Sequence, residues 1–532
     1  MQNSSVLQVL VLLGISVIAL TLLARRIGVA PPIVLLVGGV PLAFVPWLAD
    51  VRLPPQIVLL IFLPVLLNWE TLNTSLREIR ANLRVVMLNS ILLVLVTAAA
   101  VAVVAHHLGL SWPVAWVLGA VLAPTDATAV AAVARRMPRR QVTILRAESL
   151  INDGTALVLF AIAVQVASGE SHFGWPQAIG AFVLSYLGGA AAGLVVAWLT
   201  TRTRMVMRDP LLENTVNVLA PFTAFLLAEQ IHASGVLAVV VSGLALSQIN
   251  PRIVPARTRV PARAFLQLTA FMLNGTLFVL IGLQLRDAVQ DLVSYSLADA
   301  AGQALLISAV VIGTRLLWSY TTPYLIRAID RRPQQRLRRI GARNRLPVAW
   351  AGFRGGVSLA AALAVPAATT GRDLIIIVTF GVILVTMVVQ GLTLPAVLRW
   401  SRLVGDGSEQ EEQRLALHTM TEAAMAALPA EAARLGVSDD VVERMHSELE
   451  ERLAELDAAQ APAPDAAAAQ EPGTRSPRKE YKLLHLALLA TKRAALVRLR
   501  DDRLIDDIVL RRLQARLDAE ELRHSALETE SD

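Results

Sequence analysis

The sequence contains no cysteine, so disulfide bonds, thiol chemistry and cysteine-ligated metal sites are excluded. It also contains no Walker sequence of the kind that cradles nucleotide phosphates, which argues against a process driven directly by ATP. Lysine is nearly absent, because the three lysines of the chain, Lys479, Lys482 and Lys492, all lie close to its end. Before residue 479, arginine is the only permanently cationic side chain.

Long apolar runs occupy most of the first 400 residues. The chain is 55% hydrophobic with a mean hydropathy of +0.56, and runs of about 20 mostly apolar residues, the length that spans a bilayer, recur along it. This is the composition of a polytopic membrane protein. The net charge of +7 does not indicate nucleic-acid binding, because the arginines lie between the apolar segments. The first run is expected to be a true span, since residues 1–26 lack a basic n-region and a small-residue cleavage site.

Thirteen apolar segments are predicted, which gives an all-α polytopic membrane protein with about 13 transmembrane helices. Two further helical patterns, near 410–457 and 478–528, follow in a charged tail. We therefore divide the chain into a transmembrane domain, 1–403, and a cytoplasmic helical tail, 404–532, with a Pro/Ala linker near 458–477. The apolar segments are 5–24, 30–48, 54–69, 83–105, 112–134, 142–167, 176–200, 211–231, 234–249, 264–284, 299–327, 346–369 and 373–399.

Positive charge alternates between the connecting loops. Loops on the cytoplasmic side of a membrane carry the excess of Lys and Arg, and every second loop here is basic, beginning with the one after the first segment. The N-terminus is therefore predicted outside and the C-terminus in the cytoplasm, in a cell (inner) membrane. The basic segment ends also favour anionic lipids as partners. The residues that set the alternation are Arg25, Arg26, Arg77, Arg80, Arg84, Arg135, Arg136, Arg139, Arg140, Arg202, Arg204, Arg208, Arg252, Arg257, Arg259, Arg263 and the stretch 327–345.

Two apolar segments are interrupted by proline or glycine at matching positions. The fifth segment carries LAPTDATAV, with Pro124, and the twelfth carries AGFRGGVSLAAALAVP, with three glycines around Arg354. They are the fifth members of segments 1–6 and 8–13. They are seven segments apart, and because seven is odd, the two segments cross the membrane in opposite directions. Inverted repeats with discontinuous helices at the repeat interface mark the binding site of many secondary transporters. Pro124 blocks a helix hydrogen bond, and the freed carbonyls must lie beside protein or a wet cavity.

Five charged side chains lie deep within the apolar segments. They are expected to pair or to line a polar cavity, because an ionised side chain at mid-bilayer costs ~3 kcal/mol or more. Glu148 and Asn152 share one face of their helix, and Ser149 and Asp153 share the face about 100° away. Other acids, such as Glu70, sit near segment ends and are interpreted as interfacial. The five deep charges are Asp126, Glu148, Asp153, Arg315 and Arg354.

The deep charges predict different roles for the two acids on one helix. We expect Glu148 to form a structural pair with Arg315, the preferred partner, or with Arg354. Asp153 is then left as the titratable group of a cavity, where a carboxyl holds a proton more tightly than in water. Its ionised form is a hard oxygen ligand for a transported monovalent cation. Thr125, Asn152 and Ser149 are expected to add neutral oxygen ligands, and Asp126 an acid just outside them.

A proton and a cation that compete for Asp153 would be exchanged one for one across the membrane, with no net charge moved and no cofactor. A potassium/proton exchanger on the same scaffold stays open, and a proton-coupled carrier of another solute is less favoured because the broken segments carry few groups for a larger substrate. A membrane enzyme is disfavoured because His106 and His107 are adjacent and poorly placed as paired ligands. The tail is either a regulatory or assembly domain, whose regulator is unknown, or a solvated appendage.

At these residues the sequence resembles the sodium/proton antiporter family, in its electroneutral branch of bacterial type. The resemblance covers roughly residues 5–400, and its most specific element is the Asn152–Asp153 step with Glu148 four residues before Asn152. The matching stretches are PTDATAV (124–130), ESLINDGTALVLF (148–160), GTRLLW (313–318) and GFRGGVSLAAALA (352–364).

The resemblance implies thirteen helices, two crossed broken helices, an elevator-like movement of a core domain and a homodimer that serves pH homeostasis and salt tolerance. It implies that Asp153 carries cation and proton, that Arg315 neutralises Glu148, and that Arg354 lies on the second crossing helix. Electrogenic relatives typically carry Asp-Asp and an intramembrane lysine, so Asn152 and the lack of lysine before Lys479 favour electroneutral exchange. The chain departs from the family at residue 127, where Ala replaces a frequent proline.

Overall fold

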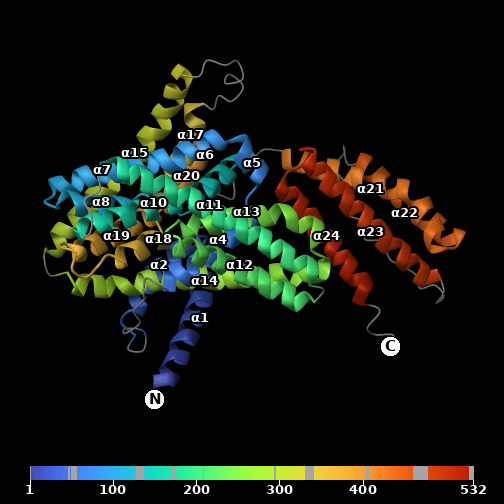
Figure 1. The fold of residues 1–532 in the computed structure, drawn as a ribbon, viewed down its shortest axis with the longest axis horizontal. Helices are drawn as coiled ribbons and strands as arrows, with labels where there is room; N and C mark the ends of the chain where they lie inside the picture. Colours follow the sequence, from blue (N-terminus) through green and yellow to red (C-terminus); the bar gives the residue numbers. More distant parts are fainter. Residues whose placement is uncertain are drawn as a thin grey trace.

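The structure is a computed structural model of the 532-residue chain. It describes residues 2–45, 48, 57–126, 137–169, 175–207, 209–292, 295–329, 341–402, 408–458 and 477–526. All regular structure within these ranges is helical, which confirms the all-α prediction. Figure 1 shows the helices of the first 400 residues packed as one body, with the last helices forming a layer beside it.

The first part of the chain holds the helices and three short π-helical turns that surround the broken segments. In chain order they are α1 (Gln2–Ile27), α2 (Pro31–Leu42), η1 (Val58–Phe62), α4 (Leu63–Leu72), α5 (Leu76–Ala81), α6 (Leu83–Met87), η2 (Leu88–Leu93), α7 (Val94–His107), α8 (Trp112–Leu122), α10 (Arg139–Ala167), α11 (Trp175–Val206), α12 (Pro210–Gln230), α13 (Gly235–Ile253), α14 (Ala256–Gln290), α15 (Leu297–Ile329), α17 (Ala342–Trp350), α18 (Gly356–Leu363), α19 (Arg372–Val385), η3 (Thr386–Gln390) and α20 (Gly391–Ser401). The tail holds α21 (Ser408–Leu435), α22 (Asp439–Ala458), α23 (Pro477–Asp501) and α24 (Asp507–Ala526).

Nine helices in the described ranges are long and apolar enough to cross a membrane, and three shorter apolar helices, Pro31–Leu42, Val58–Leu72 and Trp112–Leu122, accompany them. With the interrupted pair α17 and α18, these helices overlap all thirteen predicted segments. Their outer faces are apolar: Leu184 and Leu187 on α11 are 73% and 66% exposed. The chain is an integral membrane protein, and its thirteen crossings stay a prediction.

Close packing of small residues joins α2 to α14. A Cβ atom at Gly39 would overlap the carbonyl oxygen of Val279, and one at Gly282 would overlap that of Leu36. Glycine at both positions therefore lets the two backbones approach, as is usual at helix contacts within membranes. The large buried apolar cluster that includes Leu36 and Val279 also contains Leu122 and Phe353, which lie at the two interrupted regions.

The tail is docked on the membrane part through its aspartates. Asp506 and Asp507 are 0% and 3% exposed; Ser75 Oγ donates to Asp506 at 2.5 Å, and the backbone N–H of Leu76 donates to Asp507 at 3.0 Å. Farther along α24, Arg259 of α14 forms two hydrogen bonds with Asp518. Gln248 of α13 also donates to Asp507 at 3.2 Å, so the tail is held to the ends of α5, α13 and α14 by polar contacts.

Some sequence predictions fall outside the described residues. These are the end of the fifth segment and its basic loop, 127–136, which include Arg135 and Arg136, and also Arg208, the stretch 330–340, the domain boundary at 403–404 and most of the linker, 459–476. The division into a domain 1–403 and a tail 404–532 stays a prediction.

Candidate functional site

Helix α10 carries the polar residues on two adjacent faces, as its sequence spacing requires. Glu148, Ser149, Asn152 and Asp153 are 1%, 3%, 1% and 7% exposed. Four polar side chains are thus buried within six residues of an otherwise apolar helix, and burial of this kind needs partners.

The first interrupted region lies against this helix. Helix α8 ends at Leu122, and residues 124–126 are not helical. Ser149 Oγ donates to the Thr125 carbonyl oxygen, and Asn152 Nδ2 donates to Thr125 Oγ1 at 2.7 Å. Pro124 cannot continue the helix ladder, so side chains of α10 bind Thr125 instead.

The second interrupted region is bonded directly to the first. The backbone N–H of Asp126 donates to the Phe353 carbonyl oxygen at 2.9 Å, and Arg354 Nε donates to the Leu122 carbonyl oxygen at 3.0 Å. Arg354 is 2% exposed, and its charge lies at the C-terminal end of α8, where the helix dipole is negative. A Cβ atom at residue 355 would overlap the Asp126 carboxylate, which explains Gly355.

Glu148 is paired with Arg315 of α15. Their side chains meet at 2.5 Å with exposures of 1% and 4%, and Arg354 is bound elsewhere. Asn89 Nδ2 donates to the second Glu148 oxygen at 3.0 Å, and Trp318 Nε1 donates to Asn89 at 3.0 Å. The charge of Glu148 is therefore compensated by protein groups, which leaves it little capacity to bind an ion.

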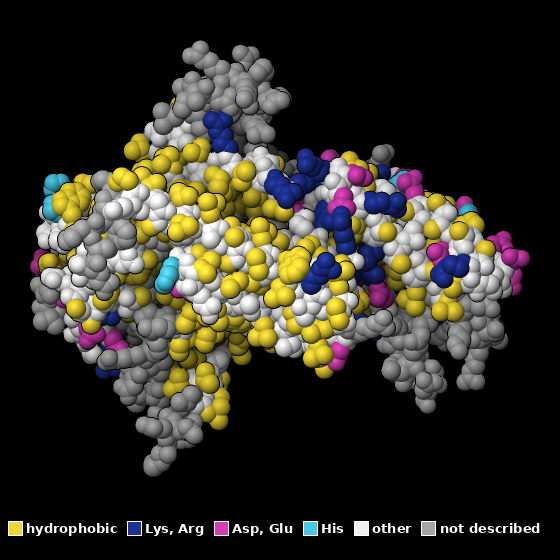
Figure 2. Space-filling view, in the orientation of Figure 1, with side chains coloured by type: hydrophobic (Ala, Val, Ile, Leu, Met, Phe, Trp, Pro, Cys, Tyr) yellow, Lys and Arg dark blue, Asp and Glu magenta, His cyan; other side chains and the backbone are white. Residues whose placement is uncertain are grey.

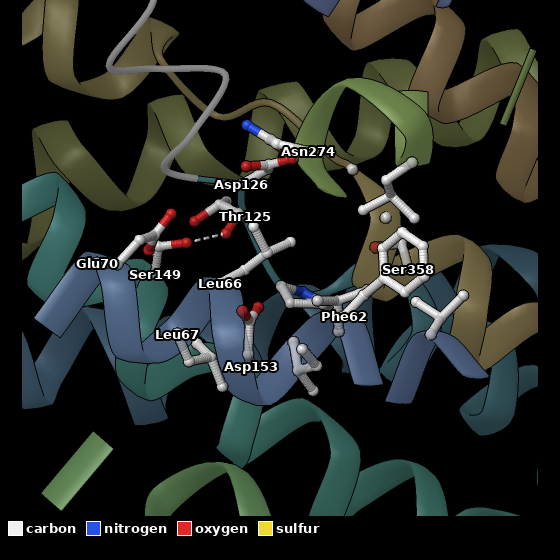
Figure 3. A pocket seen from close by; sticks show the side chains of 17 residues that line it. Phe62, Leu66, Leu67, Glu70, Thr125, Asp126, Ser149, Asp153, Asn274 and Ser358 are labelled. Carbon is white, nitrogen blue, oxygen red and sulfur yellow. Dashed lines mark hydrogen bonds between the residues drawn. The ribbon is translucent and has the colours of Figure 1, made fainter. Parts of the chain in front are cut away.

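A cavity of about 50 Å³ lies where these elements meet. Asp153, Ser149, Thr125 and Asp126 line it, together with Ser358 of α18 and Glu70 of α4. Figure 3 shows Glu70 next to Ser149 and Asp126 next to Asn274, with Asp153 facing the same space. Ser358 Oγ is buried without a hydrogen-bond partner in the structure. Carboxylate, hydroxyl and carbonyl oxygens are the ligands that hard cations prefer.

Asn152 is the predicted ligand that the structure does not bring into this cavity. It lies on the Glu148 face of α10, about 100° from Asp153. From that face its amide nitrogen donates to Thr125 Oγ1, while Asn152 itself does not line the cavity. Asn152 therefore orients Thr125. Sequence spacing placed Asn152 and Asp153 on different faces, but could not show that only one of those faces borders the cavity.

Glu70, Asn274 and Ser358 are polar cavity residues that the sequence reasoning did not assign to the site. Glu70 was missed because its position near a segment end was interpreted as interfacial. Helix α4 is short, however, and ends at Leu72 close to the two interrupted regions, which brings Glu70 within electrostatic reach of Asp126 and Asp153. A detectable signal was present: Pro64 at the start of α4 and the polar residues Asn68 and Glu70 in the same segment.

Three carboxylates thus surround the cavity, yet no group of His, Asp or Glu among the described residues is arranged to hold a metal ion tightly. Glu70→Gln is expected to raise the apparent KM for a cation that occupies the cavity roughly tenfold, an effect of ~1.4 kcal/mol, because glutamine cannot supply the negative charge that a carboxyl group gives when it ionises beside a cation. Transport assays of the variant would measure this change.

The control for that variant is Glu229→Gln, since Glu229 is an exposed glutamate at the end of α12 outside the cavity. It is expected to leave KM unchanged. An unaltered KM in Glu70→Gln would remove Glu70 from the ion path.

Comparison with known proteins relates most of the chain to one family. The family model described as "Sodium/hydrogen exchanger, transmembrane" matches residues 12–400. A Mycobacterium tuberculosis protein named an uncharacterized Na⁺/H⁺ exchanger is 45% identical over 526 residues, covering 97% of this chain and 96% of its own. The Na⁺/H⁺ antiporter ApNhaP of Aphanothece halophytica is 33% identical over 387 residues, 71% of each chain.

The structure is also similar to a solved one. The sodium/proton antiporter MjNhaP1 of Methanocaldococcus jannaschii at pH 8 superposes with a TM-score of 0.58 and 18% sequence identity, covering 75% of this chain and all of that one. At this identity the likeness bears on the fold alone.

Proposed function

The chain belongs to the sodium/hydrogen exchanger family, and on that premise we propose that it exchanges Na⁺ for H⁺ one for one, with Asp153 as the group that binds either ion. Family membership makes the protein a transporter of monovalent cations and protons. The stoichiometry, the preference for Na⁺ and the carrier residue are the steps that we add.

One observation carries the assignment of Asp153: it is the acid of α10 that borders the cavity, and no cationic side chain among the described residues forms an ion pair with it. Glu148, five residues earlier on the same helix, is bound to Arg315 and Asn89. A carboxylate that is buried without a counter-charge takes up either a proton or a metal ion. The proton and the cation therefore compete for the two carboxylate oxygens of Asp153.

The size of the cavity supports a small cargo. A volume of about 50 Å³ accommodates a cation with a few waters, since a single water needs at least ~10–15 Å³. Sites for drug-sized solutes usually measure ~300–1,000 Å³. This favours an ion over a larger co-transported solute, while K⁺ stays the alternative to Na⁺.

The neutral residue before Asp153 supports the one-for-one stoichiometry. Asn152 is neutral, so Asp153 is the one titratable group of the Asn152–Asp153 pair. The amide of Asn152 donates to Thr125. No lysine lies among the first 478 residues to release another proton. When Na⁺ replaces one proton on Asp153, the charge of the site is the same in both crossing states, so membrane voltage should not drive the exchange.

The test is transport by the reconstituted protein in liposomes that contain a pH dye. Na⁺, K⁺ and Li⁺ are added in turn, first at zero voltage and then at a set voltage. We expect a proton flux that is largest with Na⁺ and does not change with voltage. A voltage-dependent flux would overturn the stoichiometry, and a larger flux with K⁺ would overturn the cation assignment.

Competition for one carboxylate also predicts a pH effect on affinity. Where Asp153 is mostly protonated, each further unit of acidification should raise the apparent KM for the cation about tenfold, while the maximal rate stays constant. Initial rates measured over a matrix of pH values and Na⁺ concentrations would show this pattern. A KM that is independent of pH would mean that proton and cation occupy separate sites.

Orientation, assembly and location are proposed from the sequence. We place the N-terminus outside, the C-terminus in the cytoplasm of the cell membrane, and two copies in a homodimer. Labelling of single cysteines is a clean test of orientation, because the natural chain has no cysteine to interfere. A cysteine at Ser111, just before α8, should react with an impermeant reagent added outside, whereas one at Arg402 should not.

A further inference from the structure

A second and much larger cavity lies between the membrane part and the tail. It measures about 1140 Å³ and is bordered by α4, the ends of α11, α13 and α14, and the tail helix α24. It shares Leu66, Glu70 and Asn274 with the cavity of about 50 Å³ that Asp153 lines, which we call the ion cavity, so the two cavities adjoin. We call it the basic vestibule, after the arginines that line it: Arg146, Arg204, Arg259, Arg263, Arg511 and Arg512.

The charge of the basic vestibule is unexpected for a cation path. Six arginines line it against only two acids, Glu70 and Asp518, and Asp518 is already bonded to Arg259 and Arg493. Figure 2 shows Lys and Arg side chains gathered where the tail meets the rest of the molecule. Charged side chains of one sign that line a cleft raise the local concentration of ions of the opposite sign. The basic vestibule should therefore attract anions.

Three of these arginines have no carboxylate within 4.0 Å among the described residues. Arg146 donates to the Asn73 carbonyl oxygen at 3.2 Å, and Arg204 donates to the Asn250 side chain at 3.0 Å. Arg263 is exposed on α14. Arg146 lies within electrostatic reach of Glu70 and Arg204 within reach of Glu213, but neither acid forms an ion pair with them, so their guanidinium groups can still donate to a ligand.

Arg204 gives the clearest sign of a missing partner. Its side chain is 6% exposed, yet its Nε has no hydrogen-bond partner in the structure. A buried donor without an acceptor costs about 1–3 kcal/mol, and more when the group is charged. A bound oxyanion would remove that cost, because the guanidinium fork matches phosphate geometry.

The walls of the vestibule indicate what the anion is attached to. Trp69, Leu266, Phe271 and Leu522 line it beside the arginines, and its volume far exceeds that of an inorganic ion. Basic pockets between membrane helices on the cytoplasmic side bind lipid head groups. We propose that the basic vestibule binds a phosphate group carried on an apolar body, such as an anionic lipid.

The tail completes this site. Helix α24 supplies Arg511, which donates to the Thr74 carbonyl oxygen, and Arg512, which is paired with Glu409 at 2.6 Å. The helix is held in place by the buried contacts of Asp506 and Asp507. A phosphate in the vestibule would bond arginines of the membrane helices and of the tail together. The role that the sequence left open for the tail is then to form one wall of a ligand site.

The test measures binding to the full-length protein in neutral-detergent micelles by calorimetry, without an ion gradient, so its outcome is independent of transport. The probes are dioctanoyl phosphatidic acid, glycerol 3-phosphate as the soluble phosphate, and dioctanoylglycerol as the lipid without phosphate. We expect saturable binding of phosphatidic acid and none of dioctanoylglycerol. Binding of glycerol 3-phosphate as well would identify a soluble phosphate ester as a sufficient ligand, and its absence would assign the site to lipid.

The variants Arg146→Gln, Arg204→Gln and Arg263→Gln are each expected to weaken binding about tenfold, because hydrogen bonds to charged groups are the strong ones. Arg202→Gln is the matched control, since Arg202 is exposed on α11 and does not line the cavity. Arg263 is exposed, so its replacement tests the proposal even if Arg204→Gln fails to fold. Equal affinity in Arg263→Gln and Arg202→Gln, or equal binding of dioctanoylglycerol, would overturn the proposal.

Discussion

Asp153→Asn is expected to abolish cation-driven proton movement while the protein stays folded. Asparagine has nearly the volume of aspartate, so the cavity keeps its shape, but it cannot carry a proton or a negative charge. Two opposite unit charges 4 Å apart interact by about 4 kcal/mol at an effective dielectric constant of 20, and losing this corresponds to roughly a thousandfold in affinity. The liposome assay with Na⁺, K⁺ and Li⁺ measures the loss.

The matched control is Asp291→Asn, because Asp291 is an exposed aspartate at the end of α14 and does not line the cavity. It should transport at the wild-type rate. Gel filtration and thermal unfolding of both variants would show whether they are folded. Full exchange by Asp153→Asn would refute the site, whereas a loss shared with Asp291→Asn would point to a general defect of the preparation.

Breaking the Glu148–Arg315 pair is expected to produce the largest loss of stability. Removing one partner of a buried ion pair leaves an uncompensated charge and costs about 3–5 kcal/mol, whereas removing both costs much less. Glu148→Gln and Arg315→Gln should therefore each unfold at a lower temperature than the double variant. Thermal unfolding of the three proteins in one detergent gives this order.

The pair Glu431–Arg434 in the tail provides the comparison. Its side chains meet at 2.7 Å but are 27% and 63% exposed, and pairs of that kind contribute about 0–1 kcal/mol. Glu431→Gln and Arg434→Gln should hardly change the unfolding temperature. If the double Glu148/Arg315 variant is no more stable than the single ones, the two side chains contribute separately and the ion-pair interpretation fails.

The sequence predicted best those features that depend on spacing along one helix. The separation of Glu148 from Asp153 follows from 100° per residue on α10, and the two interruptions follow from Pro124 and from glycines whose backbones must approach another chain segment. Glu70 and the true place of Asn152 depend on how α4 and the interrupted regions pack around α10. Such contacts join residues far apart in the chain, and no local pattern specifies them.

The arginines show the same division. The preference for Arg315 as the partner of Glu148 agrees with their contact, whereas Arg354, the alternative partner and the residue expected on the second crossing helix, does not form that pair. In the structure Arg354 binds the last carbonyl of α8, that of Leu122. The last carbonyl groups of a helix have no partner within that helix. That the second interrupted region covers the Leu122 carbonyl, and that Arg354 donates to it, depends on the three-dimensional packing and cannot be predicted from the sequence.

The hydrogen bond between Asp126 and Phe353 has a consequence for how the protein is made. The two residues are separated by more than two hundred positions, yet each completes the backbone bonding of the other's interruption. A nascent chain that has inserted α8 and α10 carries Asp153 but must keep the Asp126 N–H and the Leu122 carbonyl bound to water or to other groups. The cavity that Asp153 lines also takes Gly355, Gly356 and Ser358 from the second interrupted region, so it can be completed only after that region has entered the membrane.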